Sequence, residues 1–258
     1  MATVNRSASI ASTQFTSKVT IDGDGIDVLF DGVDFTQSGF VEILNAKSVT
    51  FKNCRVYGLL ARAAKDYWLK APRSNKPTKL VFETCFFGPS NPNGANKMYN
   101  LIEANFPMAN GSSFSYNYIN RQCCTHNVFS VYNVEDDATI KINGNVFEYS
   151  DGSVRIGMIG APKCTIAMND NNVQSGPEDG VWAGITCIQP YEHSDPEIAT
   201  QTFAGVTITM SGNKTPTDQQ YYLYQGTRSA FDITAETAPT IILNGTSLAF
   251  EDMVLLKG

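Results

Sequence analysis

Residues 49–56, Val49-Thr50-Phe51-Lys52-Asn53-Cys54-Arg55-Val56, specify the fold of this 258-residue chain. The stretch opens with apolar, polar and apolar side chains in turn, as a strand with one buried face does. Asn53 follows, and Asn tolerates the left-handed backbone of a sharp corner. Val56 is apolar again, so the chain returns to the interior after the corner. The stretch therefore predicts a strand, a corner and a second inward-facing segment.

The same template recurs along the whole chain. Its copies begin at Val28, Val49, Leu80, Phe114, Ile140, Ile166, Ile208 and Ile241. Residues that tolerate a left-handed backbone predict corners at Gly32, Asn53, Gly144, Gly212 and Gly245. A second apolar strand precedes most copies, in residues 40–43, 101–104, 128–132, 154–159, 185–188 and 231–233. The uneven spacing fits one coil per copy with loops inserted at the corners. This pattern predicts an all-β, single-stranded parallel β-helix of about eight coils with one short helix. A β-sandwich is the alternative, but it does not require a corner residue in register at every repeat.

The position after each corner is often Asn or Cys. In a stacked solenoid, side chains at this position would lie above one another. Asn145, Asn171 and Asn213 would then form a hydrogen-bonded amide ladder, and Cys54 and Cys85 would stack as small buried residues. These five residues are the predicted structural ladder.

The Asn-x-apolar corner resembles that of the right-handed parallel β-helix superfamily, the pectate-lyase-like fold, over about residues 20 to 250. The resemblance implies a right-handed solenoid. The superfamily includes polysaccharide lyases and hydrolases, phage tailspikes and non-catalytic virion proteins, so the resemblance is specific for architecture and weak for activity.

Two segments depart from the repeat. Residues 1–20 are rich in Ser, Thr and Ala and show no period, so we expect an extended N-terminal arm, with the β-helix in residues 21–258. Residues 57–77 form a predicted helical and basic insertion, because residues 59–70 have helical spacing. The apolar positions that would share one helical face are Leu60, Ala63, Ala64, Tyr67 and Trp68.

Composition limits the compartment and the partners. Charged residues make up 17% of the chain, below the usual quarter, and the net charge is −6. An acidic chain is not expected to bind nucleic acid. No apolar run of transmembrane length or signal-peptide core is visible, which predicts synthesis in a host cytoplasm without export and no membrane contact. Without export, the six cysteines are expected to be buried thiols rather than disulfides.

The sequence shows little catalytic equipment. Superfamily hydrolases commonly combine paired carboxylates with Gly-His-Gly and Arg-x-Lys motifs, and both motifs are absent here. His126 and His193 are expected to be structural or solvent-exposed. Residues 23–29 resemble half of a calcium-binding nonapeptide repeat, without the tandem copy such a site needs. We therefore expect no cofactor, no metal and no catalytic site. If the chain were an enzyme, its acids would be among Glu135, Asp136, Asp137, Glu178 and Asp179.

Two groups of residues are candidates for binding a partner. Residues 55–79 hold seven of the 19 basic residues and one of the 25 acidic residues. This imbalance favours contact with an acidic partner, through Arg62, Lys65, Lys70, Arg73 and Lys76. Residues 219–224 form an aromatic loop in which Tyr221, Tyr222 and Tyr224 could stack on a sugar, dock on a subunit or cap the solenoid end.

These features together predict a virion structural protein of a bacteriophage, either a capsid decoration protein or a fibre-like component. It would be a homo-oligomer, a trimer, held on a capsid or tail protein by residues 1–20. It would act by binding the particle surface, and contact with a surface glycan stays open. The alternatives are a polysaccharide-degrading β-helix enzyme and a glycan-binding module.

Overall fold

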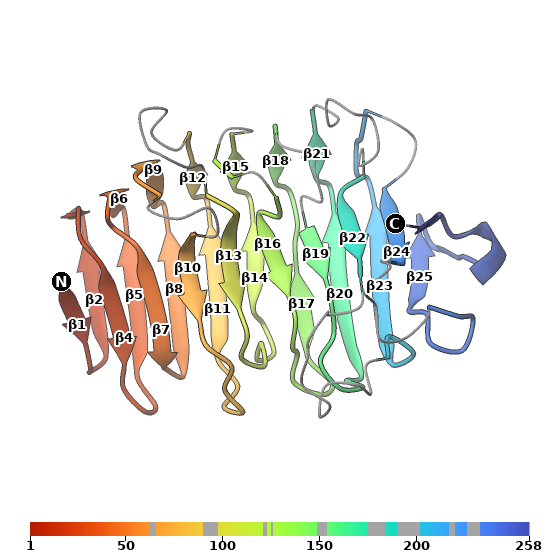
Figure 1. Ribbon diagram of the computed structural model, residues 1–258, viewed down its shortest axis with the longest axis horizontal. Helices are drawn as coiled ribbons and strands as arrows, with labels where there is room; N and C mark the ends of the chain where they lie inside the picture. Colours follow the sequence, from red (N-terminus) through yellow and green to blue (C-terminus); the bar gives the residue numbers. More distant parts are fainter. Residues whose placement is uncertain are drawn as a thin grey trace.

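The computed structural model describes residues 1–61, 66–89, 98–120, 123–124, 126–148, 154–174, 184–189, 202–216, 220–225 and 233–257. These residues form three sheets of mostly parallel strands, which we name sheets A, B and C. In each sheet the strands of successive coils stack along one common axis (Figure 1). The chain visits the sheets in the order A, B, C, and each of the first seven circuits adds one strand to each sheet. The described strands that follow, β22 to β27, belong to sheets A and B. The predicted parallel β-helix is confirmed.

Sheet A contains β1 (Ala2–Val4), β4 (Val19–Asp22), β7 (Val41–Asn45), β10 (Tyr67–Ala71), β13 (Asn100–Ala104), β16 (Phe129–Val131), β19 (Val154–Ile156), β22 (Thr186–Ile188), β24 (Tyr221–Gln225) and β27 (Leu255–Lys257). Sheet B contains β2 (Ala8–Ala11), β5 (Asp27–Asp31), β8 (Ser48–Lys52), β11 (Lys79–Glu83), β14 (Ser113–Ser115), β17 (Thr139–Lys141), β20 (Cys164–Asn169), β23 (Val206–Ser211), β25 (Thr240–Leu243) and β26 (Thr246–Ser247).

Sheet C is made of shorter strands: β3 (Gln14–Phe15), β6 (Asp34–Gln37), β9 (Arg55–Leu59), β12 (Phe86–Phe87), β15 (Tyr118–Ile119), β18 (Val146–Phe147) and β21 (Asn172–Val173). A 3-10 turn, η2 (Phe250–Asp252), precedes β27. The described residues contain no α-helix, and none of their helical turns could cross a membrane.

The register of sheet B follows the repeat read from the sequence. The first apolar residue of one copy lies beside that of the next, as Val28 does beside Val49 and Ile166 beside Ile208. One copy begins earlier than the sequence pattern suggests. Phe114 lies beside Phe82, which is the third residue of the copy that begins at Leu80. Ser112, fully buried, therefore takes the first position, and a polar residue there hid the true start.

Each circuit turns from sheet B to sheet C at a residue in the left-handed region. The φ angles are 47° at Ser12, 63° at Gly32, 52° at Asn53, 54° at Thr84, 58° at Tyr116, 65° at Gly144, 57° at Asp170 and 64° at Gly212. The corners predicted at Gly32, Asn53, Gly144 and Gly212 are confirmed. Gly245 was predicted as a further corner, but it lies in the tight turn between β25 and β26.

The interior is filled by aromatic rings that repeat from coil to coil. Phe51 stacks on Phe30 and on Phe82, with 5.0 Å between ring centroids in each pair. Phe114 stacks on Phe129 across the interior at 5.0 Å. Such pairs each add about 0.5–1.5 kcal/mol beyond their area burial. The inward positions of the template are therefore the core of the protein.

The predicted N-terminal arm is wrong, because residues 2–15 form the first coil. Strands β1, β2 and β3 pair in parallel with β4, β5 and β6. Ile10 and Phe15 lie beside Phe30 and Phe35 and pack on the core. The segment is thus another copy of the template, in which small polar residues on the outer face concealed the alternation.

The predicted helix over residues 59–70 is also wrong for its described part. Residues 67–71 form strand β10, and Trp68 and Leu69 are fully buried. The indole Nε1 of Trp68 donates a hydrogen bond to the carbonyl oxygen of Gly39 at 3.2 Å. Over so few residues, apolar spacing does not separate a helix from a buried strand. Residues 62–65, including Ala63 and Ala64, lie outside the described residues.

Candidate functional site

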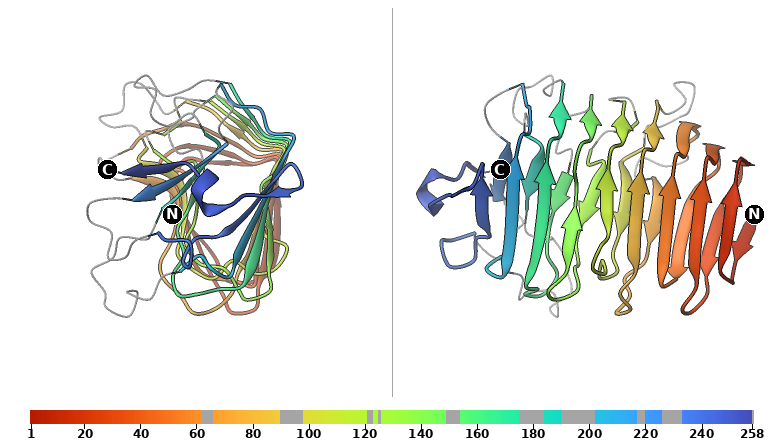
Figure 2. Two further views of the ribbon diagram at one scale, coloured as in Figure 1. Left: turned by 90° about the vertical axis from the view of Figure 1, so that its right-hand side faces the viewer. Right: turned by 180° about the vertical axis from the view of Figure 1, so that it is seen from behind.

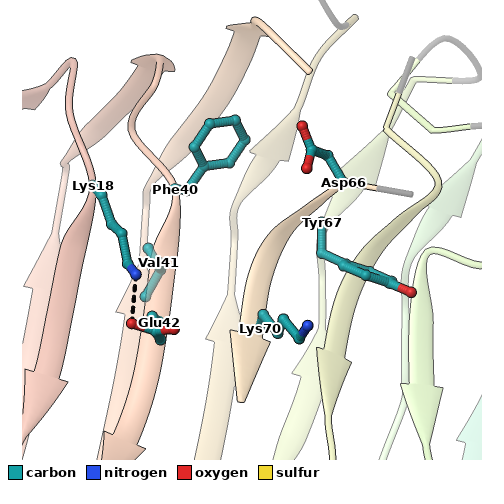
Figure 3. Close-up of a pocket in the computed structure, with 7 residues that line it drawn as sticks. All are labelled: Lys18, Phe40, Val41, Glu42, Asp66, Tyr67 and Lys70. Carbon is teal, nitrogen blue, oxygen red and sulfur yellow. Dashed lines mark ion pairs between the residues drawn. The ribbon is translucent and has the colours of Figure 1, made fainter. Parts of the chain in front are cut away.

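A pocket of about 290 Å³ opens on the outer face of sheet A, over β4, β7 and β10 (Figure 3). Its charged groups come from neighbouring coils, and Lys18 Nζ lies 2.5 Å from Glu42 Oε2. The lining residues are Lys18, Phe40, Val41, Glu42, Asp66, Tyr67 and Lys70. The pocket therefore combines two ammonium groups, two carboxylates and a phenol with apolar surface.

The charges of the outer face alternate from rung to rung. In the strand register of sheet A, Lys70 lies opposite Glu42 on one side and opposite Glu103 on the other. Adjacent parallel strands lie about 4.8 Å apart, so opposite charges become direct neighbours and stabilise one another. Lys70 Nζ also lies 5.7 Å from the ring centroid of Tyr67, within the range of a cation–π contact.

Tyr67 is a hydrogen-bond donor at this site. Burial raises the pKa of its phenol, and the charge of Glu103 and its hydrogen bond to the phenol raise that pKa further. The same carboxylate accepts a hydrogen bond from Asn100 Nδ2 at 3.1 Å. The phenol is therefore neutral at physiological pH and is held by a fixed acceptor.

Aromatic rings extend the pocket along the axis. Tyr99 lies edge-on to Tyr67, with ring centroids 6.3 Å apart, and its centroid lies 4.0 Å from that of His126. Tyr67 and Tyr99 are partly exposed, and His126 is exposed. We name Glu42, Tyr67, Lys70, Tyr99, Glu103 and His126 the sheet A strip.

The strip ends where the outer face becomes buried. The row that contains Glu103 continues through Ser130, Arg155 and Cys187. Ser130 is fully buried and Cys187 is 4% exposed, although both belong to the outward-facing row. The Arg155 guanidinium lies 5.5 Å from the ring of Tyr132. Beyond Glu103 the row is therefore buried at Ser130 and Cys187, and Arg155 between them is partly exposed.

The predicted basic surface is not a single patch. Lys70 belongs to the sheet A strip, whereas Arg55 lies on sheet C, where it pairs with Asp34 at 2.6 Å. Lys76 is exposed and pairs with Asp24 at 2.9 Å, and Arg73 is exposed. Because one coil winds through all three sheets, residues close in sequence face different directions. Two further candidates, Arg62 and Lys65, lie outside the described residues.

The predicted aromatic loop is largely strand β24. Tyr221 and Tyr222 are only 5% and 4% exposed, so their predicted role on an accessible loop is wrong. The hydroxyl of Tyr221 donates to the carbonyl oxygen of Asp252 at 3.1 Å, and burial raises the pKa of this phenol. This contact fits the capping interpretation. The side chain of Tyr224 lies outside what the structure describes.

The candidate catalytic acids stabilise turns. Glu135 Oε2 accepts a hydrogen bond from the Asn110 amide at 3.3 Å, and Asp136 Oδ1 accepts one from the Lys163 amide at 3.0 Å. Asp137 has a φ of 61° in the same turn. Glu178, Asp179 and His193 lie outside the described residues. Among the residues placed by the structure, no three His, Cys, Asp or Glu side chains form a group that could hold a metal ion.

The predicted ladder exists and is longer than expected. Nδ2 of Asn145 donates to Oδ1 of Asn171 at 2.9 Å, and Nδ2 of Asn171 donates to Oδ1 of Asn213 at 3.0 Å. Asn117 joins the ladder, since its Nδ2 donates to Asn145 Oδ1 at 3.0 Å. The displaced start of its repeat copy concealed Asn117 in the sequence.

The cysteines continue the same column. Cys85 follows next, and its amide donates to Asn117 Oδ1 at 2.8 Å. The Cys54 and Cys85 thiols donate to the carbonyls of Phe30 and Phe51 on the preceding coil, both at 3.4 Å. All six cysteines are buried and none forms a disulfide, as predicted.

No family model, curated protein or solved structure matches this chain. The likeness to the β-helix superfamily therefore rests on the corner motif.

Proposed function

We propose that this protein is a structural component of a bacteriophage virion, of the fibre-like or decoration type, that acts by binding. The observation that carries the proposal is a column of residues whose side chains hydrogen-bond to a neighbouring coil, namely Cys54, Cys85, Asn117, Asn145, Asn171 and Asn213. A column that locks successive coils makes the solenoid a stiff rod, which suits a mechanical role. The assignment to a phage rests on the resemblance of the corner motif to a superfamily that includes virion proteins.

The surface proposed for the particle contact is the sheet A strip. Residues 2–15 are strands of the first coil and are not available as a flexible clamp. The strip presents alternating charges at Glu42, Lys70 and Glu103, beside partly exposed aromatic rings. A capsid or tail protein with a complementary row of charges would bind such a surface in one register.

The test is incorporation of charge-reversed variants into gradient-purified particles. Lys70→Glu with Glu103→Lys exchanges two charges of the strip and sets a glutamate opposite Glu42. Lys52→Glu with Glu83→Lys reverses an ion pair of 3.7 Å on the outer face of sheet B. We expect the first variant to be missing from particles and the control to be incorporated like the unaltered chain. A chain present in the lysate and absent from all particles would refute the virion role.

A second candidate function is binding of a surface glycan, favoured by the rings of the strip. Tyr67, Tyr99 and His126 lie beside the polar groups of Glu103 and Lys70. Sugar ligands bind to aromatic faces flanked by such polar groups. Calorimetric titration with purified host polysaccharide should show binding that Tyr99→Ala weakens strongly. Equal binding by the unaltered chain and the variant would reject the strip as a glycan site.

The candidate catalytic acids that the structure describes support a binding function rather than polysaccharide cleavage. Glu135 and Asp136 accept hydrogen bonds from backbone amides of the two neighbouring coils, which gives these carboxylates a structural role. A reducing-sugar assay on the same polysaccharide tests this part of the proposal. Release of new reducing ends would favour the depolymerase alternative.

A further inference from the structure

A second pocket, of about 550 Å³, lies at the corner where the chain turns from sheet B to sheet C. Three successive coils line it, and each supplies its left-handed corner residue and the first residue of its sheet C strand. In chain order these residues are Ser12 and Gln14, Gly32 and Asp34, and Asn53 and Arg55. The left view of Figure 2 looks along the stack, and successive coils turn there from the long strands of sheet B into the short strands of sheet C. The pocket therefore lies on a different face of the solenoid from the sheet A strip.

The hollow of this pocket results from the missing side chain at Gly32. Apart from the adjacent residues, a Cβ added at Gly32 would meet only Ser12 Oγ within 4 Å, at 3.9 Å. At the equivalent corner of Gly144 this space is filled, because the ring of Tyr116 from the preceding coil lies 2.6 Å from the place of such a Cβ. Ser12 and Asn53 occupy the same corner position in the coils before and after Gly32. The hollow is therefore bounded by a coil in both directions along the axis.

The two charged groups of the pocket neutralise one another. Arg55 Nε donates to Asp34 Oδ1 at 2.8 Å, and Arg55 Nη2 donates to Asp34 Oδ2 at 2.6 Å. This bidentate contact holds both planar groups in one orientation. The guanidinium keeps three of its five N–H donors for other partners, and each carboxylate oxygen can accept a further hydrogen bond. Because the pair has no net charge, we expect a neutral ligand that carries both donors and acceptors.

The first coil adds polar groups that are available to a ligand. Ser12, Thr13 and Gln14 line the pocket and are exposed. Within the part of the chain that the structure describes, their two hydroxyls and one carboxamide have no hydrogen-bond partner. A hydroxyl both donates and accepts, and a carboxamide does each with a different atom. A ligand rich in hydroxyl groups matches this mixture of donors and acceptors.

Aromatic rings continue the site along sheet C. Phe86 lies opposite Arg55 in the strand register and stacks on Tyr118, with ring centroids 5.7 Å apart. Both rings are exposed, although most large apolar side chains of the described residues are buried. The Arg55 guanidinium also lies 5.8 Å from the ring centroid of Tyr57. From Asp34 to Tyr118 the site covers three strand spacings, about 14 Å, which is longer than a single sugar ring.

We name Gly32, Asp34, Arg55, Phe86 and Tyr118 the corner site, and we propose that it binds a neutral oligosaccharide. Each hydroxyl of such a ligand both donates and accepts, as the polar groups of the pocket require. The apolar C–H faces of its sugar rings can rest on the exposed aromatic rings, since ligand sites combine aromatic surface with a few placed polar groups. The corner site shares no residue with the sheet A strip. The inference therefore rests neither on the strip nor on the proposed virion role.

The test is calorimetric titration of the 258-residue chain with the neutral probes maltotriose, cellotriose and laminaritriose. Gly32→Asn fills the hollow and keeps the left-handed corner, because Asn53 has a φ of 52° at the same position of the next coil. Gly25→Asn is the matched control outside the site, since Gly25 has a φ of 69° and an added Cβ there would meet nothing within 4 Å. We expect at least one probe to bind. Its affinity should fall at least about tenfold in Gly32→Asn and stay unchanged in Gly25→Asn.

Two further variants separate the corner site from the strip and from effects on folding. Phe86→Ala removes an exposed ring of the corner site and should also weaken binding, whereas Tyr99→Ala on the sheet A strip should not. A chain that binds none of the three probes would overturn the proposal, as would equal affinity in Gly32→Asn and the unaltered chain. If Gly32→Asn does not fold, Phe86→Ala decides the result. Binding that Tyr99→Ala abolishes and Phe86→Ala leaves unchanged would belong to the strip and would also overturn the proposal.

Discussion

Asn145 and Asn171 lie 26 positions apart in the chain and are joined side chain to side chain, because Nδ2 of Asn145 donates to Oδ1 of Asn171 at 2.9 Å. The same Oδ1 accepts the amide N–H of Asn145 at 3.0 Å. The carboxamide of Asn171 therefore binds both the backbone and the side chain of Asn145 on the preceding coil. This relationship repeats at each rung of the ladder and sets the register of the solenoid.

Replacing Asn145 by Ala should destabilise the protein strongly. Asn145 is fully buried, and its loss leaves the amide of Asn117, the carbonyl of Phe114 and Oδ1 of Asn171 without this partner. Each buried unsatisfied group costs about 1–3 kcal/mol. Asn213→Ala is the control, since its environment is only part-buried and its loss should cost less. Urea unfolding of both variants measures the difference, and equal losses would contradict burial as the cause of the larger loss at Asn145.

Replacing Cys85 by Asn should be tolerated. The Cys85 thiol already donates to the carbonyl of Phe51, which is the interaction that Asn117 Nδ2 makes with Phe82. An Asn at this position would extend the amide ladder by one rung. We expect a change in unfolding free energy below about 1.5 kcal/mol, as for a volume-conserving core substitution. Cys85→Leu, which cannot donate a hydrogen bond, should cost more. Equal destabilisation by both substitutions would contradict a stabilising hydrogen bond from Asn at this position.

The left-handed corners predict opposite effects for two substitutions. Gly144 has a φ of 65°, so Gly144→Ala should destabilise by about 1–2 kcal/mol. An added Cβ would also lie 2.6 Å from the ring of Tyr116, which would have to move. Thr84 has a φ of 54°, so Thr84→Gly relieves a strained β-branched residue and should be near neutral or stabilising despite greater chain entropy. Thermal melting of the two variants checks the sign of each effect.

The protein should lose stability in alkali partly through Cys164. Burial, and secondarily the charge of Asp136, raise the pKa of this thiol from 9.0 to about 12. The folded state therefore favours the neutral thiol, and its contribution is complete below the unfolded pKa near 9. As pH rises from about 9 to 12, the unfolded chain releases the proton first, so the free energy of unfolding falls. Urea midpoints across this range should fall less steeply for Cys164→Ala, and parallel slopes would contradict the assignment.

Much of the fold could be predicted because its signals are local. Alternation of period two, a left-handed corner residue and the Asn or Cys after it act within eight residues, as in residues 49–56. The pairing of Val28 with Val49 therefore follows from the pattern alone. The predictions failed where one local signal was weak: Ser112 at the start of its copy, small residues in the first coil, and the apolar run around Trp68.

The order of side-chain types along the chain was sufficient for the strand-and-corner repeat, the apolar interior and most of the ladder, because each depends on residues within one coil. Only the three-dimensional arrangement determines which side chains are neighbours on the surface. That arrangement placed Glu42, Lys70 and Glu103 in one row, separated Arg55 from Lys70, and buried Tyr221 within β24. Neighbours across coils depend on how many residues each loop inserts, and that number is not encoded in the pattern of any single repeat.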